Sequence, residues 1–414
     1  MSSIKTPDYC TIDFGDGYSV SLTATNGTVS PSSQVTGYNG SVSFTVSPNS
    51  GFKAELETNT CGGTLSGNTY TVNNITSGKT CSITFKSSTP TLYAKLLADK
   101  TMRPNRGSFS SVLTSNNTNT LYTSTENGTT VYYFAGNATD NWVKFGKNAS
   151  NQDLYWRIIR TNSDGGVRLL YHGTSTTATD AVINTSTAFN TTGNDPMYVG
   201  YMYGTSGSLV NNRTNANNST IKTTIDNWYA SNLEAKGYTK YISTTAVYCN
   251  DRSNPAGGYN TGNSRFYYGA YTRLYTNKTP SYDCATTEDK FTVDSSTGNG
   301  KLDHPIALMT ADEVSFAGGL YGNSAQTWYY KNSANGSSTG DTWWLLLSPF
   351  IWTNSDASVF CVCGSFCPGN LGNLGVYGTN GVRPVISLKS CVKTSGGDGS
   401  AGTPYTIEET ETGC

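Results

Sequence analysis

The sequence predicts an α+β domain that follows a small all-β sandwich, and three observations indicate this fold class. Charged residues make up 13% of the 414 residues, about half the usual fraction, whereas Gly, Ser, Thr and Asn are abundant and 28 Tyr are present. Short alternating apolar and polar stretches separated by turns run through residues 8–89. From about Trp142, further strand patterns are joined by two helical patterns. Because aromatic residues make up 12% of the chain, a disordered low-complexity chain is excluded.

The alternating segment at residues 8–89 predicts a β-sandwich. Strand patterns lie at residues 13–14, 19–22, 42–46 and 81–85, with turns at Asn26-Gly27, Ser50-Gly51 and Ser66-Gly67-Asn68. The runs NGTVSPSSQ, GSVSFTVSPNSGF and TCSITFK are similar to runs in the immunoglobulin-like repeats of bacterial surface proteins. That resemblance implies a spacer or stalk over residues 1–89, with no chemistry of its own.

Residues 131–414 are expected to form the second domain, after a linker or docked segment at residues 90–130 that contains one helical stretch, residues 92–97. A strand is expected at residues 142–146 and a hairpin at residues 154–171. One helix is expected around residues 219–229, with Ile221, Ile225 and Trp228 on one face. A second is expected near Thr310, because Thr310 and Glu313 have the capping-box spacing.

Ten cysteines in a chain rich in Tyr, Asn and Thr predict an oxidising compartment. Three pairs lie near each other in the sequence and are interpreted as local disulfides: Cys61 with Cys81, Cys249 with Cys284, and Cys391 with Cys414. Cys10 is either free or competes for Cys61 or Cys81, so the connectivity stays open. The start MSSIKTP is not a secretion signal, so we expect a removed signal or anchor, or export by another route.

Charge and hydropathy exclude two classes of partner. The net charge is −1 and Lys and Arg form no cluster, so nucleic acid and anionic membrane surfaces are poor partners. No apolar stretch approaches the length that crosses a bilayer, so we expect no direct membrane insertion.

The window at residues 345–380 is distinguished by what it lacks. It reads LLLSPFIWTNSDASVFCVCGSFCPGNLGNLGVYGTN and holds one charged residue, Asp356, with no Lys, Arg, Glu, Gln, Met or His. Trp343-Trp344 precede it, and an apolar run at residues 381–388 follows it. Small, aromatic and amide residues between rigid apolar borders are typical of a binding surface rather than a catalytic centre.

Several runs of the second domain carry a family resemblance. WVKFG and LYWRIIRTNSDGGVRLLY match opening strands, DNWY a first helix and PIALMTADEVSFAGG a second, while WW…SP and GVRPVISLKSCV frame the window. Over residues 90–414 the chain resembles C-type-lectin-fold proteins of the formylglycine-generating-enzyme-like branch, most closely the variable proteins of diversity-generating retroelements. Gly369, Leu371, Val376, Thr379 and Gly381 follow that family's spacing of fixed positions.

The resemblance implies a C-type-lectin fold whose fixed residues hold the structure while the positions between them are rewritten. In such systems the adenines of a template, largely within AAC codons, are randomised, which excludes Lys, Glu, Gln, Met and Trp. Trp352 is then part of the scaffold. The expected ligand-binding residues, here called the variable set, are Phe350, Ile351, Thr353, Asn354, Ser355, Asp356, Ser358, Phe360, Cys361, Cys363, Ser365, Phe366, Asn370, Gly372, Asn373, Leu374, Tyr377 and Gly378.

Roles within and around the variable set follow from residue type. The expected anchors are Phe350, Phe360, Phe366 and Tyr377, with Asn354, Asp356, Asn370 and Asn373 as polar contacts. The expected scaffold is Trp343, Trp344, Pro349, Trp352, Gly381, Arg383 and Pro384. Val359 and Val362 have opposite strand parity, so both face the core only if a bulge intervenes or both sides of the strand are covered. An ordinary buried strand pair is the competing interpretation, although the Gly- and Asn-rich residues 370–378 fit it badly.

The expected function is therefore ligand binding without catalysis. The resemblance places such a protein outside the cell, on a bacterial surface or a phage virion, with an unidentified protein or glycan on another cell or virus as its ligand. No cofactor is expected, although a structural calcium ion stays open despite the lack of ordered ligand spacing. One alternative is a glycan-binding adhesin of fixed specificity. The other is a copper-dependent oxidase, because the formylglycine-generating family uses a cysteine pair and Cys361, Cys363 and Cys367 lie close together.

Catalytic motifs are weak in this sequence. His172 and His304 are the only histidines, so multi-histidine metal sites are excluded and a Ser-His-Asp triad would need one of them. A Gly-x-Ser-x-Gly match at residues 336–340 lies in an Asn, Ser and Gly loop without the strand and helix that a nucleophile requires. The glycine-rich match at residues 397–402 precedes Thr403-Pro404 rather than a helix, so it does not predict a dinucleotide site.

Overall fold

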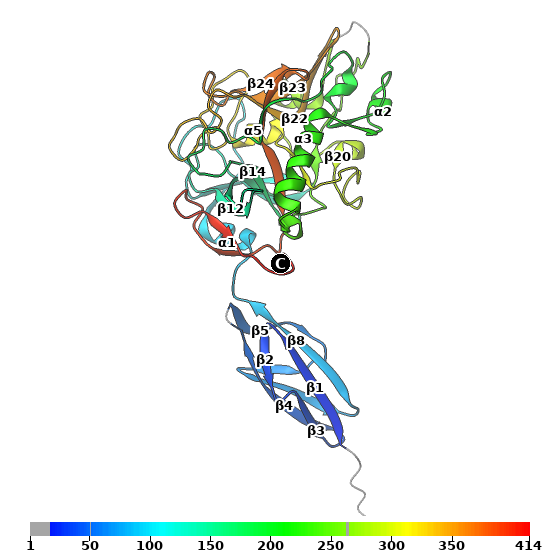
Figure 1. Cartoon of the computed structure of the whole chain (residues 1–414), viewed down its shortest axis with the longest axis vertical. Coiled ribbons are helices and arrows are strands. Elements are labelled where there is room, and N and C mark those ends of the chain that lie inside the picture. Colours follow the sequence, from blue (N-terminus) through cyan, green and yellow to red (C-terminus); the bar gives the residue numbers. More distant parts are fainter. Residues whose placement is uncertain (1–16, 50, 262–264) are drawn as a thin grey trace, which may run out of the picture. The chain divides into compact units, whose positions relative to one another are not determined.

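The computed structural model describes residues 17–49, 51–261 and 265–414, and the chain forms two compact units that divide between Pro90 and Thr91 (Figure 1). Both units are rich in β-strands. The strand expected at residues 13–14, the cysteine at position 10 and the first residue of the turn at Ser50-Gly51 lie outside the described residues.

The first unit consists of two sheets, with strand orders β3-β1-β8-β5 and β2-β4-β7-β6. Pairing is antiparallel except between β1 and β8, which run parallel. The strands are β1 Tyr18–Thr25, β2 Gly27–Ser30, β3 Ser33–Thr36, β4 Gly40–Pro48, β5 Phe52–Asn59, β6 Thr64–Ser66, β7 Thr69–Ile75 and β8 Lys79–Ser87.

Period-two alternation explains the core of the first unit. In β4 the side chains of Val42, Phe44 and Val46 are buried, whereas those of Ser43 and Thr45 between them are exposed. Alternating residues of β1, β7 and β8 join them in one apolar cluster, so the inner faces of both sheets meet as in a sandwich. The disulfide between Cys61 and Cys81 closes the loop after β5 onto β8.

One extended sheet organises the second unit, with the order β21-β26-β14-β13-β11-β10-β9; in addition β12 pairs with β13, β28 with β12 and β27 with β28. The strands of this sheet are β9 Thr101–Arg103, β10 Thr120–Glu126, β11 Thr129–Tyr133, β12 Trp142–Lys147, β13 Asp153–Thr161, β14 Val167–Tyr171, β21 Ile306–Leu308, β26 Pro384–Leu388, β27 Thr394–Gly396 and β28 Tyr405–Ile407. The hairpin expected at residues 154–171 is formed by β13 and β14.

A second sheet of this unit holds the charge-poor window. Its order is β15-β25-β22-β23-β24, and β19 pairs with β22. The strands are β15 Asn184–Ala188, β19 Arg265–Tyr267, β22 Trp344–Thr353, β23 Asp356–Val362, β24 Leu371–Gly375 and β25 Thr379–Val382. Two short ladders complete the strands of the unit: β16 Met202–Tyr203 with β17 Asn217–Asn218, and β18 Tyr248–Cys249 with β20 Lys290–Phe291.

The helices of the second unit begin at side-chain caps that the sequence allows. Ser219 caps the amide of Lys222 in α3, and Thr310 and Glu313 form a reciprocal capping box in α5. Ile221 and Ile225 of α3 are buried, as its periodicity predicts. The α-helices are α1 Leu92–Asp99, α2 Leu209–Asn212, α3 Thr220–Tyr229, α4 Gly269–Tyr271 and α5 Ala311–Ala317. The shorter helical turns are η1 Pro196–Val199, η2 Ala230–Glu234, η3 Tyr238–Tyr241, η4 Thr272–Asn277 and η5 Thr287–Asp289.

Residues 91–130 belong to the second unit and are docked on it rather than forming a free linker. Leu92 and Leu96 of α1 are buried in the core of this unit, and the amide of Leu92 donates to the carbonyl oxygen of Val392. Strands β9 and β10 then pair in parallel at one end of the extended sheet. The segment thus provides edge structure to the second unit.

A buried network of charges joins the sheet to α5. Arg160 donates hydrogen bonds to Glu126 (2.8 Å) and to Glu313 (3.1 Å), and Arg168 donates to the same Glu313 oxygen at 2.9 Å. All four side chains are less than a tenth exposed. Burial raises the pKa of Glu126, but the neighbouring arginines outweigh it and hold that pKa at about 2. Each carboxylate therefore stays charged and paired inside the fold.

Disulfides occur in both units. Besides Cys61–Cys81, the described cysteines form Cys249–Cys284, Cys391–Cys414 and Cys363–Cys367, the last within a triplet for which the sequence left a disulfide or free thiols open. Such a disulfide content is typical of proteins outside the reducing cytoplasm. Across the described parts of the chain, no helix has the length and apolar character needed to span a bilayer.

Candidate ligand-binding site

The charge-poor window folds into three neighbouring strands, β22, β23 and β24, which lie together in the upper part of Figure 1. β22 and β23 are joined by a tight turn in which Asn354 and Ser355 both have positive φ angles, 45° and 118°. β23 then pairs with β24 in an unbroken antiparallel register from Ser358 opposite Gly375 to Val362 opposite Leu371. The window is therefore one continuous patch of the second sheet.

The parity conflict between Val359 and Val362 is resolved by burial on both faces of β23. Every residue from 357 to 362 is buried, so side chains that point to opposite faces both meet protein. Irregular pairing occurs as well, but in β22. Leu345 lies opposite Cys361 and Pro349 opposite Val359, so four steps along β22 match two along β23.

The structure divides the variable set by exposure. Exposed members lie at the turn and in loops, half-buried members lie on β24, at the strand ends beside the turn and in loops, and buried members lie on or next to β22 and β23. The exposed residues are Asn354, Ser355, Ser365, Phe366 and Tyr377; the half-buried ones are Thr353, Asp356, Asn370, Gly372, Asn373, Leu374 and Gly378; the buried ones are Phe350, Ile351, Ser358, Phe360, Cys361 and Cys363.

Three members of the variable set do not meet the expectation of ligand contact. Phe360 and Cys361 have no exposed surface and Cys363 is 2% exposed, so a ligand cannot touch them in this conformation. Phe360 and Cys361 are buried because both faces of β23 are covered, and Cys363 is buried directly after this strand. Phe360, which we expected to be an anchor, instead packs in the interior against Phe350, with ring centroids 4.9 Å apart.

The residues expected to form the scaffold are buried, apart from the half-buried Trp343. The guanidinium of Arg383 lies 4.9 Å from the ring centroid of Trp344 and donates to the carbonyl oxygens of Tyr171 and Tyr329. At Gly381 a Cβ atom would lie 2.8 Å from the carbonyl oxygen of Trp343, so a side chain has no room there. Pro349, Trp352 and Pro384 complete this rigid support.

A groove of about 420 Å³ opens over part of the variable set. Such a volume lies in the range of about 300–1,000 Å³ found for small-molecule sites. Six members of the variable set line the groove together with five residues from elsewhere in the chain. The lining residues are Arg265, Tyr267, Tyr271, Tyr275, Tyr321, Phe350, Ile351, Thr353, Asp356, Ser358 and Asn373.

Four tyrosines, here called the tyrosine wall, form the side of the groove that lies outside the window: Tyr267, Tyr271, Tyr275 and Tyr321. The ring of Tyr271 stacks between those of Tyr267 (3.9 Å between centroids) and Tyr275 (4.9 Å). Tyr321 meets Tyr275 edge to face and stacks on Phe350 at 5.2 Å. The wall is thus packed into one aromatic cluster with the floor of the groove.

Polar groups of the wall and the window meet inside the groove. The hydroxyl of Tyr321 donates to the side-chain oxygen of Asn373 at 2.7 Å. Burial raises the pKa of Tyr271 to about 12, and the neighbouring hydroxyl of Tyr267 contributes to the same shift, so Tyr271 keeps its proton at neutral pH. Burial also raises the pKa of the Asp356 carboxyl, an effect that the Tyr377 hydroxyl opposes.

Arg273 holds the tyrosine-bearing turn α4–η4 in place. Its guanidinium donates two parallel hydrogen bonds to Asp312 at the start of α5, at 2.9 and 2.8 Å, and a third to Asp251. Burial lowers the pKa of Arg273, but the two carboxylates outweigh it and raise this pKa above its ordinary value. The turn that carries Tyr271 and Tyr275 is therefore fastened to a helix of the core.

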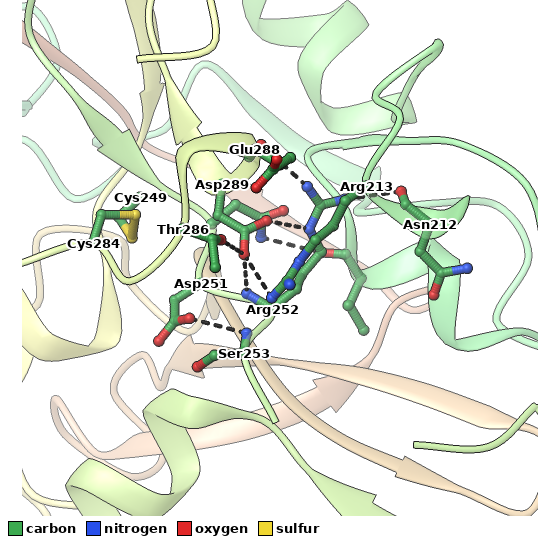
Figure 2. Close-up of polar contacts among 12 residues, drawn as sticks. Asn212, Arg213, Cys249, Asp251, Arg252, Ser253, Cys284, Thr286, Glu288 and Asp289 are labelled. Atoms are coloured by element: carbon green, nitrogen blue, oxygen red, sulfur yellow. Dashed lines mark hydrogen bonds and ion pairs between the residues drawn. A yellow bond between two sulfur atoms is a disulfide. The ribbon is translucent and has the colours of Figure 1, made fainter. Parts of the chain in front are cut away.

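The ends of the long loop that carries three of the four wall tyrosines, Tyr267, Tyr271 and Tyr275, are also fixed. The disulfide Cys249–Cys284 joins them, and Figure 2 shows the polar contacts beside it. The buried carboxylate of Asp289 accepts hydrogen bonds from the Arg252 amide (2.9 Å) and guanidinium (2.7 Å), and Arg213 lies 3.0 Å away. These buried charges are stable only when they are paired. Their pairing therefore fixes the place at which the loop leaves the core.

Sequence reasoning missed the tyrosine wall. Tyr267, Tyr271 and Tyr275 recur every fourth residue, a spacing that places side chains on one side of a helix and could have identified the first three. Tyr321 and Arg265 carry no local signal, because the fold alone brings them to the window.

The cysteines of the window do not present a pair of thiols. Cys363 and Cys367 are joined, and the tight loop that they close exposes 88% of Phe366. Cys361 is free and buried, and burial raises the pKa of its thiol. Among the described residues, no group of three or more His, Cys, Asp or Glu side chains is arranged to hold a metal ion. These residues do not fit the copper pair that the oxidase alternative requires.

Both histidines have structural neighbours. His172 is fully buried, with its ring 4.4 Å from that of Trp142, and burial lowers its pKa well below the ordinary value. The ring of His304 lies 4.9 Å from that of Tyr229. Neither residue lines the groove.

Comparisons of the chain with protein-family models, with curated proteins and with solved structures gave no match. The candidate site is therefore defined by the residues and contacts described above.

Proposed function

We propose that this chain is a ligand-binding protein whose groove recognises its ligand through residues diversified by a retroelement. The observation that carries this proposal is the groove itself, because it joins six members of the variable set to a preorganised aromatic wall. Of the residue types excluded by adenine-directed change, Lys, Glu, Gln and Met are missing from the window and Trp occurs only at the scaffold position Trp352, while rigid scaffold residues support the window from below. Aromatic and small polar side chains of this kind bind ligands at low entropic cost.

Burial refines which positions we propose to be diversified for binding. Asn354, Ser355, Asp356, Asn373 and Tyr377 lie at the surface or half-buried, so their replacement leaves the core intact. Phe360 and Cys361 lie in the interior, where truncating a large side chain or adding a charge costs several kcal/mol. The proposed repertoire therefore resides in the first group.

The fold that we propose for residues 91–414 is the C-type-lectin fold. The two larger sheets of the second unit, its capped helices α3 and α5 and the run from β22 to β26 support this proposal. We further propose that the sandwich at residues 17–90 is an immunoglobulin-like spacer and that the protein acts outside the cell, on a bacterial surface or a phage virion. The disulfides favour this location.

Sequencing the locus in many isolates tests the diversification. We expect an imperfect repeat near the gene that differs from the coding copy at adenines, and a neighbouring reverse transcriptase gene. Amino-acid differences between isolates should concentrate at the exposed and half-buried members of the variable set. A locus without repeat and reverse transcriptase, and without such differences, would contradict the proposal.

Two matched libraries test the protein side. One randomises Asn354, Ser355, Asp356, Asn373 and Tyr377, and the other randomises Phe360, Cys361 and Cys363. We expect most members of the first library and few of the second to display a folded chain, read out by resistance to protease. Equal loss of folding in both libraries would show that the groove cannot carry diversity.

A further inference from the structure

We infer that the groove takes a neutral saccharide, and that the tyrosine wall is a constant half of this site, shared by all members of the repertoire. This inference rests on the proposed ligand-binding function and adds the class of ligand. It also assigns binding roles to residues outside the window, Tyr267, Tyr271, Tyr275 and Tyr321.

The lining of the groove favours a ligand that is covered with hydroxyl groups. Nine of the eleven lining residues carry a side-chain hydrogen-bonding group, and the other two, Phe350 and Ile351, are buried at the floor. A protein partner would need a deep apolar pocket for an aromatic or aliphatic anchor. A sugar instead offers hydroxyls around its edge and a small apolar C–H face, which suits rows of tyrosines.

The charges of the groove favour a neutral ligand. Arg265 and Asp356 are the charged lining residues, one of each sign, so their formal charges cancel. Both lie at the same end of the groove, because Arg265 in β19 and Asp356 in β23 each pair with Thr353 of β22. A planar guanidinium and a planar carboxylate on the two strands that flank Thr353 provide donors and acceptors for the hydroxyls of a sugar ring.

The wall is rigid before any ligand arrives. Tyr271 is held between two stacked rings, and Arg273 in the same turn is bound to Asp312 and Asp251. Tyr275 is 48% exposed, so its hydroxyl and part of its ring are available to a ligand. Because little side-chain freedom is left to lose, binding to this wall costs little conformational entropy.

The two sides of the groove then have different roles. Asp356 and Asn373 belong to the variable set, whereas the tyrosines lie 24 residues or more before Leu345, where the window begins. Changes in the window would alter which hydroxyls are recognised, while the wall would keep the preference for a sugar. Members of one repertoire should thus differ in the sugar that they select but not in the class of ligand.

The test uses the full chain on an array of neutral and sialylated oligosaccharides. We expect binding to a subset of the neutral glycans. Tyr275→Ala and Tyr321→Ala should each weaken that binding at least tenfold, and Tyr275→Phe, which removes only a hydroxyl, should weaken it less. Tyr38→Ala is the matched control, because Tyr38 is 70% exposed and lies in the first unit, so its variant should bind like the parent chain.

Unfolding curves that match the parent chain establish that each variant is folded before its binding is compared. The inference is overturned if the folded parent binds no saccharide, binds only sialylated glycans, or keeps its binding in both alanine variants. It is also overturned if the groove variants lose binding to a protein while no glycan binds. Locus sequencing separates the two proposals, since adenine-directed differences can be present when saccharide binding is absent, and the reverse.

Discussion

The strands of the first unit and strand β23 of the second bury their side chains in different ways. In β4, exposed and buried residues alternate, so Phe44 is inside while its neighbour Thr45 is in solvent. In β23, the consecutive residues Phe360 and Cys361 are both buried, because β22 and β24 flank the strand and both of its faces are covered. Burial on both faces therefore accounts for the absence of charge inside β23 without any role in ligand binding.

This difference changes the meaning of the charge-poor window. Its depletion in charged residues extends over surface positions such as Asn354 and Tyr377 and over interior positions such as Phe360. Burial alone accounts for the interior positions, but it does not account for the absence of Lys and Glu at the surface ones. The ligand-binding interpretation therefore depends on the turn, on Asp356 at the start of β23, on β24 and on the loops, rather than on the interior residues Phe360 and Cys361.

The largest predicted effect comes from placing a charge on the buried strand β23 and comparing it with the same charge on the alternating strand β4. Cys361→Asp places a charge without a partner in the interior, and we expect a loss of about 3–5 kcal/mol in the free energy of unfolding of the second unit. Thr45→Asp, the matched change at an exposed strand position, should change the stability of the first unit by about 0.5 kcal/mol or less. Denaturant titration of both variants measures this. A mild effect of Cys361→Asp would mean that β23 opens to solvent.

The second prediction is that acid lowers the stability of the second unit more than that of the first. Glu126 has a folded pKa of about 2, below its ordinary value, so its contribution is complete above about pH 4.5 and is lost as the pH falls toward 2. The loss should be on the order of 3 kcal/mol for the second unit. The ion pairs of the first unit, such as Lys53 with Glu55, are exposed and should add little.

Unfolding at a series of pH values from 6 to 2, with a probe for each unit, measures the acid sensitivity. The variant Glu126→Gln serves as the control, because its carboxamide does not titrate and the slope over this range should become shallower. An unchanged slope in this variant would assign the acid sensitivity to other carboxylates.

A third prediction concerns the disulfide of the first unit. Replacing Cys61 and Cys81 by Ala opens a loop with a sequence separation of 20 residues, and we expect a loss of about 3 kcal/mol in the first unit. The second unit should keep its own unfolding transition, because the two units have separate apolar cores. A calorimetric scan that shows both transitions moving together would contradict this independence.

The smallest effect is expected at the turn between β22 and β23. Ser355 has a φ angle of 118°, which a residue with a Cβ atom adopts only with strain, so Ser355→Gly should stabilise the second unit by about 0.4–1 kcal/mol. Ser365→Gly, at an exposed loop position where no positive φ occurs, should not stabilise it. Thermal unfolding compares the two variants, and equal shifts would argue against strain at the turn.

Local patterns were sufficient for much of the fold. The alternation at residues 42–46, the hairpin turn at Asp164–Gly166 and the capping box at Thr310 and Glu313 predicted elements that the structure contains. Each of these signals acts over a few residues, through strand periodicity or through side chains that bond nearby amides. The three local disulfide pairs are present as well.

The candidate site was predictable only in part, because its two sides come from distant segments. The window supplied Asp356 and Asn373, but Tyr267 precedes the window by nearly 80 residues and reaches it through the pairing of β19 with β22. The burial of Phe360 was not predictable either, because one of the rings that pack on it, Tyr321, comes from a segment outside the window.

By itself, the sequence determined a charge-poor composition with ten cysteines, a two-part organisation, the helix caps and a window without most charged residue types. Those properties depend on residue identity and short spacing. The tertiary structure alone decided which window residues face a groove, that a tyrosine wall stands opposite them, and that Arg273 fixes the wall to α5. Such contacts join residues far apart along the chain, and only the packing of the folded sheets brings them within reach.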